Sequence, residues 1–385
     1  MSTIYLDVSR SLSRLYHGLK PTGVDRVSLA YVARYRAQAR AVLSEAGWLG
    51  VLSEKDSQRA FDLLLSVTRE RNTIRRLIAR ACIGQMFGGK RCGPGVLLHL
   101  SHNGMEHGRY YQALSRREIR TVFMVHDLIP LTHAEYCRTG IDVKHRSRIH
   151  TALRQAHGLI ANSQDTLDEL AAEARSARLF LPPTVVAHLA PGISEASLTA
   201  RPFNANYFVI LGTIEPRKNH WFILHVWRRV VESLGDAAPK LVIIGRRGWE
   251  CENAVDMLER CAALRGVIIE EPECDDDRLR AWLQHSQALL FPSFAEGFGM
   301  PLVEALAMGV PVIASNLGVF HEIAGEVPHF LDPLDGPGWK AAIESYARSD
   351  SDARRAQLAR IDQFRVPTWP DHFDKIDGFL EELTR

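Results

Sequence analysis

The sequence predicts an α/β protein built from two consecutive Rossmann-like domains. Short apolar runs, each followed by a stretch with helical spacing of apolar residues, recur along most of the chain. This alternation is typical of parallel sheets with crossover helices. It is interrupted near residues 191–206, where the chain becomes rich in Pro, Ala, Ser and Asn, as in an interdomain linker. The length of 385 residues suits two domains of ordinary size, each with its own core.

The predicted elements divide the chain into three parts. The N-terminal domain, residues 1–195, has a helix near 24–35 and strands at 4–8, 96–100, 121–125, 158–161 and 184–189. The second domain, 203–365, has strands at 207–211, 240–244, 266–269, 288–291 and 311–314, with helices near 219–234, 252–264, 276–285 and 301–308. Residues 366–385 follow a proline-containing break and form a helix that we expect to pack back toward the N-terminal domain. Because ligand loops lie at the carboxyl ends of parallel strands, we expect the two domains to face each other across a cleft.

The composition narrows the class of protein. A formal net charge of +2 does not favour nucleic acid as a partner. The six cysteines are scattered without metal-ligand spacing, so we interpret them as reduced thiols. No apolar run approaches the roughly 20 residues of a membrane-spanning helix, and the first residues lack the pattern of a secretion signal. We therefore expect a cytoplasmic protein.

The segment FPSFAEGFGMPLVEALAMGVP, residues 291–311, carries the richest chemistry. A predicted strand ends at Phe291, and a glycine-containing loop leads to Pro301, which suits a helix start. Glycines let a ligand approach the backbone, and a helix N-terminus presents free N–H groups to an anion. Glu296 and Glu304 bracket the loop, and carboxylates suit the paired hydroxyls of a ribose or a sugar because they only accept hydrogen bonds. The alternative is a glycine-rich turn between two solvated glutamates.

This motif resembles the retaining GT-B glycosyltransferases of family 4, which share two glutamates eight positions apart around GFGMP. The resemblance extends through ALAMGVPVIAS, residues 305–315, and more loosely through most of the chain. It implies the GT-B fold, with Glu304 on the nucleotide ribose and Glu296 beside the donor sugar. It also implies that the backbone of the intervening loop contacts the donor; the donor-binding residues there are Gly297, Phe298, Gly299, Met300 and Leu302.

A pair of cations, Arg217 and Lys218, follows another predicted strand in LGTIEPRKNH, residues 211–220. Two adjacent cations at a strand end can neutralise a diphosphate leaving group, where charge builds up as the glycosidic bond breaks. The resemblance implies this role for them. Taken alone, the pair also fits a solvated basic turn.

The N-terminal domain contributes weaker candidates. Gly23, in GLKPTGVDR, opens a predicted helix and would let the first strand–helix loop pass close to a phosphate. The GxGxxG fingerprint is absent, which weighs against an NAD enzyme. His126 follows the strand at 121–125, and the resemblance implies that it contacts the donor sugar, although a single histidine can also be a packed residue. His102, Asn103 and His107 are candidates for the acceptor side.

Other charged and histidine residues fit structural roles. Asp275-Asp276-Asp277 precedes a predicted helix and suits an N-cap, so we expect no metal and no cofactor beyond the donor substrate. His145, His150 and His157 lack metal-site spacing and are interpreted as helix-surface residues. Residues 268–276 depart from the family pattern. In similar enzymes this loop flanks the nucleotide base, so the identity of the base in the donor stays open.

Residues 68–92 carry seven Arg or Lys against one Glu. An apolar helical face is predicted there, formed by Ile74, Leu77, Ile78, Ala81 and Cys82. Such a basic amphipathic helix can lie on an anionic membrane. An ordinary surface helix packed against the N-terminal sheet fits the pattern equally well.

The expected reaction is transfer of a hexose from a nucleotide diphosphate sugar to a hydroxyl of a glycan or lipid-linked oligosaccharide, in surface polysaccharide biosynthesis. The resemblance implies retention at the anomeric carbon. Mannose from GDP-mannose is favoured, because TGVDR and HDLIPLTHAEY look more like mannosyl- or rhamnosyl-type relatives. The alternatives are a sugar-nucleotide epimerase, a phosphorylase, or a catalytically silent sugar-nucleotide-binding or scaffold subunit.

Overall fold

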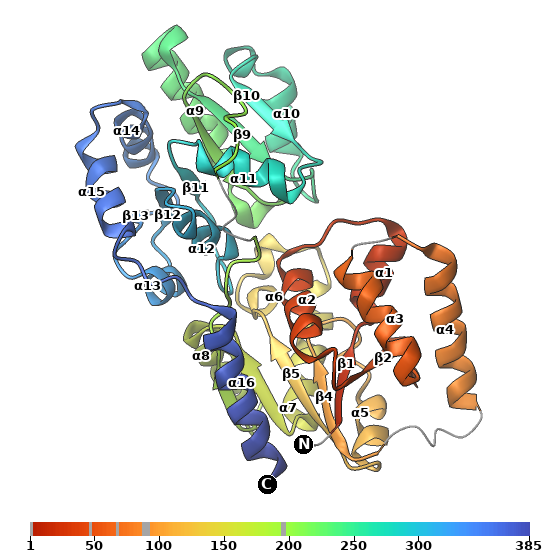
Figure 1. Cartoon of the computed structure of the whole chain (residues 1–385). Helices are drawn as coiled ribbons and strands as arrows, with labels where there is room; N and C mark the ends of the chain where they lie inside the picture. The colour runs from red at the N-terminus through yellow and green to blue at the C-terminus, as the bar shows by residue number, and fades with distance from the viewer. Residues whose placement is uncertain (1–2, 46–47, 67–68, 87–92, 194–197) are drawn as a thin grey trace. The chain divides into compact units, whose positions relative to one another are not determined.

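The computed structural model describes residues 3–45, 48–66, 69–86, 93–193 and 198–385 and contains two compact units (Figure 1). Unit 1 comprises Met1–Leu131, Gly140–Leu189 and Trp369–Arg385; unit 2 comprises Thr132–Thr139 and Ala190–Thr368. Each unit contains one predominantly parallel β-sheet with helices between its strands. The predicted α/β class with two Rossmann-like domains is therefore confirmed. The segment Thr132–Thr139 groups with unit 2, although both its neighbours in sequence belong to unit 1.

The sheet of unit 1 has the strand order β3-β2-β1-β4-β5-β6-β7. Its strands are β1 (Thr3–Asp7), β2 (Ala39–Glu45), β3 (Trp48–Val51), β4 (Gly95–His99), β5 (Ile119–Val125), β6 (Gly158–Ala161) and β7 (Thr184–Val186). Only the β2–β3 pair is antiparallel among these strands. From β1 to β3 the strands are added toward one edge of the sheet, and from β4 to β7 they are added toward the other edge. The direction therefore switches between β1 and β4. Open sheets of this kind bind ligands at the carboxyl ends of the strands that flank such a switch point.

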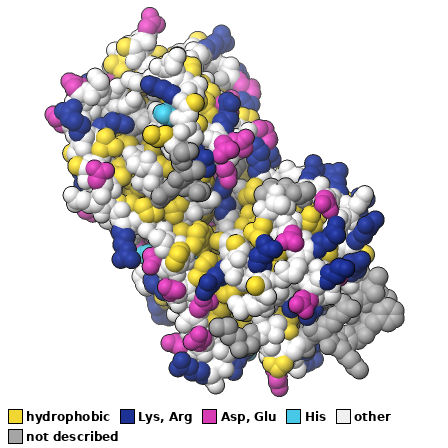
Figure 2. All heavy atoms as spheres, viewed as in Figure 1, with side chains coloured by type: hydrophobic (Ala, Val, Ile, Leu, Met, Phe, Trp, Pro, Cys, Tyr) yellow, Lys and Arg dark blue, Asp and Glu magenta, His cyan; other side chains and the backbone are white. Residues whose placement is uncertain are grey.

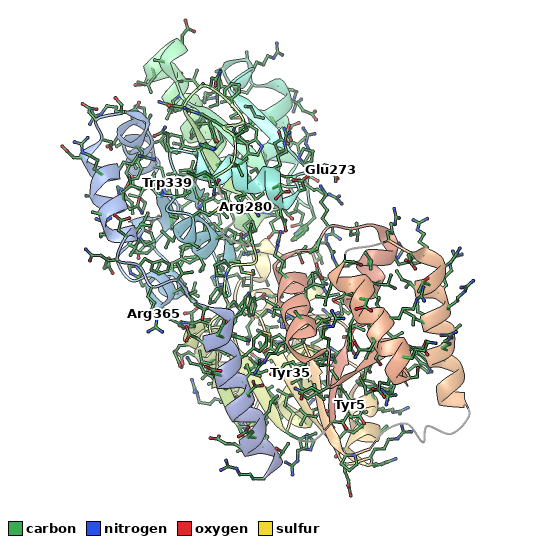
Figure 3. The ribbon with its side chains drawn as sticks, in the orientation of Figure 1. Tyr5, Tyr35, Glu273, Arg280, Trp339 and Arg365 are labelled. Atoms are coloured by element: carbon green, nitrogen blue, oxygen red, sulfur yellow. The ribbon has the colours of Figure 1, made fainter. Side chains whose placement is uncertain are left out.

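The helices of unit 1 come from the N-terminal part of the chain and, in the case of α16, from its C-terminal end. They are α1 (Ser9–His17), α2 (Gly23–Tyr35), α3 (Glu54–Leu65), α4 (Arg71–Met86), α5 (Gly108–Ser115), α6 (Ile129–Thr132), α7 (Ile141–Gln155), α8 (Gln164–Ser176) and α16 (Trp369–Thr384). The C-terminal α16 packs against α2, where Tyr35 Oη donates a 2.6 Å hydrogen bond to Asp377. Tyr35 is labelled in Figure 3. A Cβ on Gly158 of β6 would lie 2.6 Å from the Leu383 side chain, so this glycine permits the close approach of α16.

The sheet of unit 2 is entirely parallel, in the order β10-β9-β8-β11-β12-β13. Its strands are β8 (Tyr207–Leu211), β9 (Lys240–Ile244), β10 (Ile268–Glu271), β11 (Leu289–Phe291), β12 (Val312–Ser315) and β13 (His329–Leu331). Its helices are α9 (His220–Leu234), α10 (Glu252–Arg260), α11 (Asp276–Gln284), α12 (Met300–Ala307), α13 (Gly318–Ala324), α14 (Gly336–Ala347) and α15 (Asp352–Ile361). Trp227 of α9 is fully buried in its core. Trp339 of α14 is fully buried in the same core (Figure 3). The switch point of this sheet lies between β8 and β11.

All ten predicted strands occur, some with shifted bounds, and three strands of the described residues were not predicted. The expected bounds of β6, β8 and β9 match the structure, whereas the strand expected at 184–189 ends at Val186. β2, β3 and β13 are additional. β2 begins four residues after α2 with no proline or glycine between them, so the local sequence gives no sign of the change from helix to strand. The helix expected at 252–264 ends at Arg260 and continues as a 3-10 turn, Ala262–Leu264.

Candidate functional site

The switch point of unit 2 brings two loops together at the carboxyl edge of the sheet. The first loop follows β8 through Gly212 to the 3-10 turn Pro216–Lys218, and the second follows β11 to the start of α12. The backbone N–H of Phe294 donates a 2.9 Å hydrogen bond to Arg217 O, which joins the two loops. Gly212 has φ +145°, and a Cβ there would lie 3.3 Å from Lys218 Cε. The glycine therefore lets the Lys218 side chain lie along the backbone of the first loop.

Four charged side chains meet between these loops, and we call Glu215, Arg217, Lys218 and Glu296 the charge cluster. Glu296 binds both cations: Oε2 is 2.8 Å from Arg217 Nη1, and Oε1 is 2.5 Å from Lys218 Nζ. Arg217 Nη2 also lies 2.9 Å from Glu215 Oε1. The side chains of Lys218, Glu296 and Glu215 are only 11%, 9% and 6% exposed. Two acids and two bases thus share a largely water-excluded site whose formal charges sum to zero.

The pKa values of the charge cluster are set by burial and by its own charges. Burial alone would raise the pKa of Glu296, but the charges of Arg217 and Lys218 lower it to about 2. Burial lowers the pKa of Lys218, against the attraction of Glu296. Burial raises the pKa of Glu215. Glu296 is therefore held as a carboxylate by the two cations.

The two cations are held differently. Arg217 Nε donates to Glu215 Oε1 and Nη1 donates to Ala295 O, at 3.2 and 2.7 Å, in addition to its contact with Glu296. Its planar guanidinium is thus fixed from several directions. Lys218 Nζ contacts Glu296 and lies 4.9 Å from the centroid of the Phe291 ring. Lys218 is a compact charge at the strand end, whereas Arg217 also ties the two loops together.

The glycine-containing loop leads into α12 as predicted. Gly299 is the N-cap of α12 with φ +98°, and Pro301 lies at the helix start. A Cβ on Gly299 would lie 2.7 Å from Cε1 of the buried Phe320, so the close packing and the positive φ both require glycine. Phe298 and Met300 are buried beside this N-cap. Leu302 is fully buried and its N–H bonds to Gly299 O, so neither group is available for the donor contact expected of it.

Glu304 lies on α12, one helix turn beyond the loop. Its side chain is buried, with 4% of the residue exposed, and Oε1 accepts a 3.2 Å hydrogen bond from Gly192 N. Gly192 lies near the start of the second segment of unit 2, Ala190–Thr368, more than 100 residues before Glu304. The structure thus places Gly297, Phe298, Gly299, Met300 and Glu304 on one loop and helix start, next to the charge cluster. Sequence reasoning missed Glu215 and Gly192; only the EPRK context of Glu215 could have indicated its role.

His126 follows β5 in unit 1 and is one of three adjacent imidazoles. Its ring lies 5.5 Å from that of His102, which in turn lies 4.8 Å from the ring of His145. His126 Nε2 is 2.8 Å from Leu100 O, and His126 N–H donates to His102 Nε2. Burial lowers the pKa of all three, and the neighbouring His145 and His126 further lower that of His102. The three rings therefore favour the neutral form.

The interpretation of His145 as a helix-surface residue was wrong. His145 is 3% exposed, and its Nε2 lies 3.2 Å from Asp127 O. His157 lies beyond the end of α7, and its Nδ1 accepts a hydrogen bond from Thr121 N; this expectation was also wrong. His150 does lie on α7, half-buried and 2.7 Å from Glu173 Oε1. Helical spacing shows which side of α7 a residue occupies but not that α7 packs next to the loop after β5.

Sequence reasoning also missed a polar network at the switch point of unit 1. Asp7, at the end of β1, accepts hydrogen bonds from Ser9 Oγ and Ser44 Oγ at 2.6 and 2.7 Å. His99 Nδ1, at the end of β4, lies 3.4 Å from Asp7 Oδ2. The other acceptor-side candidates lie nearby in sequence: Asn103 O contacts His99 Nε2, and His107 is the N-cap of α5. These residues come from different elements, so their proximity depends on the strand order.

Gly23 opens α2, as the sequence predicts, but the helix start is already occupied. Thr22 N donates to Asp25 Oδ2 at 2.7 Å in a capping box. Arg10 Nε and Arg14 Nε lie 2.9 and 2.7 Å from the two carboxylate oxygens of Asp25. An internal carboxylate therefore meets the positive end of α2 and two arginines next to Gly23. The N-cap predicted at Asp275 is confirmed, because Asp275 accepts a hydrogen bond from Arg278 N at the start of α11.

The amphipathic stretch at 68–92 forms α4, with residues 68 and 87–92 outside the described residues. Its apolar face packs into unit 1, where Ile74, Leu77 and Ala81 are at most 1% exposed, while Ile78 is 44% exposed. The guanidinium groups of Arg71 and Arg75 each lie 5.5 Å from the Tyr16 ring centroid. Lysine and arginine side chains gather over this part of unit 1 (Figure 2). The structure therefore agrees with a packed surface helix whose outer face is basic.

Within the described ranges, no helix combines the length and apolar character needed to cross a membrane. In the same part of the chain, no three His, Cys, Asp or Glu side chains group as a metal ion would require.

Comparison with known structures identifies the fold. The Anabaena protein Alr3699/HepE, solved with UDP and glucose, matches with a TM-score of 0.69 and 16% identity, covering 99% of this chain and 100% of that one. An α,α-trehalose-phosphate synthase (UDP-forming) from Burkholderia vietnamiensis matches with a TM-score of 0.66 and 10% identity, covering 99% of both chains. The chain therefore has the fold of GT-B glycosyltransferases.

The family of unit 2 follows from sequence comparison. Residues 205–348 match the family described as glycosyl transferases group 1. The serotype-specific mannosyltransferase WbdA of Escherichia coli is 29% identical over 221 residues, 53% of this chain and 27% of its own. The O-antigen chain mannosyltransferase B of Escherichia coli is 31% identical over 163 residues, 42% of each chain. The matched part thus spans less than half the length of these relatives. Residues 205–348, which contain the charge cluster and Glu304, match the group 1 glycosyltransferases, and the resemblance of the motif to GT-B glycosyltransferases is confirmed.

Proposed function

We propose that this protein is a retaining glycosyltransferase that moves a hexose from a nucleotide diphosphate sugar to a hydroxyl of a glycan. One observation carries the proposal: a pair of largely buried cations, whose side chains are 19% and 11% exposed, and Glu304 flank the glycine-containing loop at the switch point of a group 1 glycosyltransferase domain. This edge of the sheet offers positive charge for a diphosphate and carboxylates for hydroxyl groups. The fold shared with solved glycosyltransferases supports the assignment.

The charge cluster suits the departure of a nucleoside diphosphate. As the bond from the sugar C1 to the diphosphate oxygen breaks, negative charge develops on that oxygen, and Lys218 and Arg217 stabilise it. Both cations are paired with Glu296 in the structure. A bound diphosphate replaces Glu296 on Lys218, and the carboxylate then accepts hydrogen bonds from the sugar hydroxyls. The acceptor oxygen bonds to C1 on the face that the diphosphate leaves, and its proton passes to the departing diphosphate oxygen.

The loop and helix start hold the rest of the donor. Glu304 accepts hydrogen bonds from the ribose hydroxyls, and the backbone at Gly297, Phe298, Gly299 and Met300 orients the sugar. Glu304 is already oriented by the N–H of Gly192, so little side-chain entropy is lost when the ribose binds. His126 contacts the sugar or the acceptor, and its lowered pKa keeps it neutral at pH 7. Gly23 has the weakest support, because Asp25 already occupies the adjacent helix start.

The donor we propose is GDP-mannose. The support is that relatives with 29–31% identity are named as mannosyltransferases, two of them of O-antigen chains. These names also support an acceptor that is a glycan or lipid-linked oligosaccharide of a surface polysaccharide. Because the cations of the charge cluster can neutralise the diphosphate, we propose a metal-independent reaction that needs no further cofactor. Unchanged turnover in excess chelator is the expected result, and loss of turnover contradicts it.

We also propose that the protein works in the cytoplasm, in peripheral contact with the inner face of the membrane through α4. The exposed face of α4 carries Arg71, Arg75 and the 44% exposed Ile78, which suits an anionic surface. Flotation with anionic and neutral vesicles tests this contact. Greater recovery with anionic vesicles is expected, and equal recovery contradicts the proposal.

A ligand screen followed by a transfer assay tests the proposed reaction. Thermal shifts are measured with GDP-, UDP- and dTDP-sugars, since a ligand that binds only the folded protein stabilises it by RT ln(1+[L]/Kd). The stabilising donor is then incubated with oligosaccharide acceptors, and the anomeric configuration of the product is determined by NMR. An α-linked product from an α-linked donor is expected. Donor consumption without any acceptor indicates an epimerase, and binding without turnover indicates a silent subunit.

A further inference from the structure

The segment Thr132–Thr139 contacts two loops at the carboxyl edge of the unit 2 sheet, the loop after β11 and the loop after β9. It contains a 3-10 turn, Ala134–Tyr136, and groups with unit 2. The ring of Tyr136 stacks on that of Phe294, with centroids 4.8 Å apart and planes inclined by 7°. Two residues further on, the guanidinium of Arg138 lies 5.1 Å from the ring centroid of Trp249. The segment is therefore anchored on the loop after β11 by one contact and on the loop after β9 by the other.

Phe294 joins the loop that carries Glu296 to the loop that carries Arg217 and Lys218. Its N–H donates to Arg217 O, and the next residue, Ala295, accepts a hydrogen bond from Arg217 Nη1. Glu296 follows and binds both cations. A shift of the Phe294 backbone would therefore move Glu296 and Arg217 relative to each other. The stacked ring of Tyr136 restricts this shift because parallel aromatic rings in contact resist sliding apart.

We propose that Tyr136 is a positioning residue for the charge cluster: its ring holds Phe294, and Phe294 holds Arg217 and Glu296 in register. The inference rests on the proposed function for its effect on catalysis. It concerns a residue outside the group 1 domain, which begins at residue 205. The ring makes the contact, so phenylalanine should replace tyrosine without loss. Arg138 keeps the segment attached to Trp249 when the stack is removed.

Hydrogen exchange tests the positional effect without reference to activity. Exchange of the peptide covering residues 292–299 is followed by mass spectrometry in wild type, Tyr136→Leu and Tyr136→Phe. Trp221→Leu is the matched control, because Trp221 is a 51% exposed aromatic of the same unit whose ring contacts His225. We expect exchange in this peptide to be roughly 2- to 10-fold faster in Tyr136→Leu, the range that an aromatic pair supplies. Tyr136→Phe and Trp221→Leu should exchange as wild type does.

Turnover supplies the second readout. In Tyr136→Leu, kcat should fall roughly 2- to 10-fold while the KM for the acceptor stays unchanged, and Tyr136→Phe should restore kcat. Equal exchange of residues 292–299 in Tyr136→Leu and wild type overturns the inference, as does equal impairment of the Leu and Phe variants. If wild-type protein shows no transfer with any donor, the proposed function fails. The exchange experiment still decides whether Tyr136 holds the loop.

Discussion

Replacing Glu296 with glutamine tests the charge cluster most directly. The change keeps the size of the side chain but removes the anion shared by Arg217 and Lys218. A fall of the Glu296 pKa from 4.5 to about 2 corresponds to about 3 kcal/mol of stabilisation, at 1.36 kcal/mol for each tenfold change in proton affinity. Breaking a buried ion pair by removing one partner has an effect of similar size. We therefore expect Glu296→Gln to lower the free energy of unfolding of unit 2 by about 3 kcal/mol at pH 7.

The pH dependence of this difference follows from the direction of the pKa shift. The pKa is lower in the folded protein than in the unfolded chain, so the stabilisation is complete above pH 4.5 and is lost as the pH falls toward 2. The glutamine variant has no such carboxyl group to titrate. The difference between the two proteins should therefore stay constant from pH 7 to pH 5 and shrink below pH 4.5.

Urea unfolding followed by tryptophan fluorescence measures this difference. Five of the seven tryptophans lie in unit 2, so the signal reports mainly on that unit. Glu270→Gln is the matched control, because Glu270 forms an ion pair with Arg247 in which the side chains are 33% and 40% exposed. Its effect should stay within about 0.5 kcal/mol. A Glu296→Gln variant as stable as this control at pH 7, or a difference that does not shrink between pH 4.5 and 3, refutes the reasoning.

Three further substitutions separate binding, turnover and folding. Lys218→Ala should lower kcat roughly 10²- to 10³-fold in initial-rate assays, because a charge aimed at the leaving oxygen is lost; near-normal turnover contradicts its role. Glu304→Ala should weaken nucleoside diphosphate binding about tenfold by calorimetry with a smaller change in kcat, and an unchanged Kd counts against the ribose contact. Gly299→Ala should lower the free energy of unfolding by roughly 1–3 kcal/mol more than Gly309→Ala. Both glycines have positive φ, but only at Gly299 would a Cβ meet Phe320. Equal effects of the two glycine variants would show that the contact does not matter.

Local sequence was sufficient for the elements that build the half of the site where we propose that the nucleotide binds. The apolar run ending at Phe291, the glycines after it and Pro301 together predict a strand, a loop and a helix start, and the structure has all three. These signals are local because backbone φ preferences and the lack of a proline N–H act on neighbouring residues. The pairing of Glu296 with both cations was not predicted. The motif defines separate roles for these residues, and Lys218 and Glu296 are 78 positions apart in the sequence, so no local pattern indicates their contact.

In unit 1, the sequence patterns did not predict contacts between elements that are distant in the sequence. His145 has the spacing of a helix-surface residue, yet it is buried against His102 and the backbone of Asp127. The apolar face of α4 suits a membrane as well as a protein core, and packing into unit 1 buries Ile74 and Leu77. In both cases the periodicity describes one helix correctly. The neighbour of that helix is set by strand order and crossover direction, which single-helix patterns do not contain.

The sequence by itself determined the two-domain α/β class, the group 1 motif and the residue types that can hold a diphosphate and a ribose. Those properties follow from apolar periodicity and from the chemistry of side chains within short segments. Only the tertiary structure decided that Glu296 neutralises Arg217 and Lys218, that Glu304 is oriented by Gly192, and that Tyr136 stacks on Phe294. Charges and rings act over a few ångströms, and the fold brings these groups within that distance although scores of residues separate them along the chain.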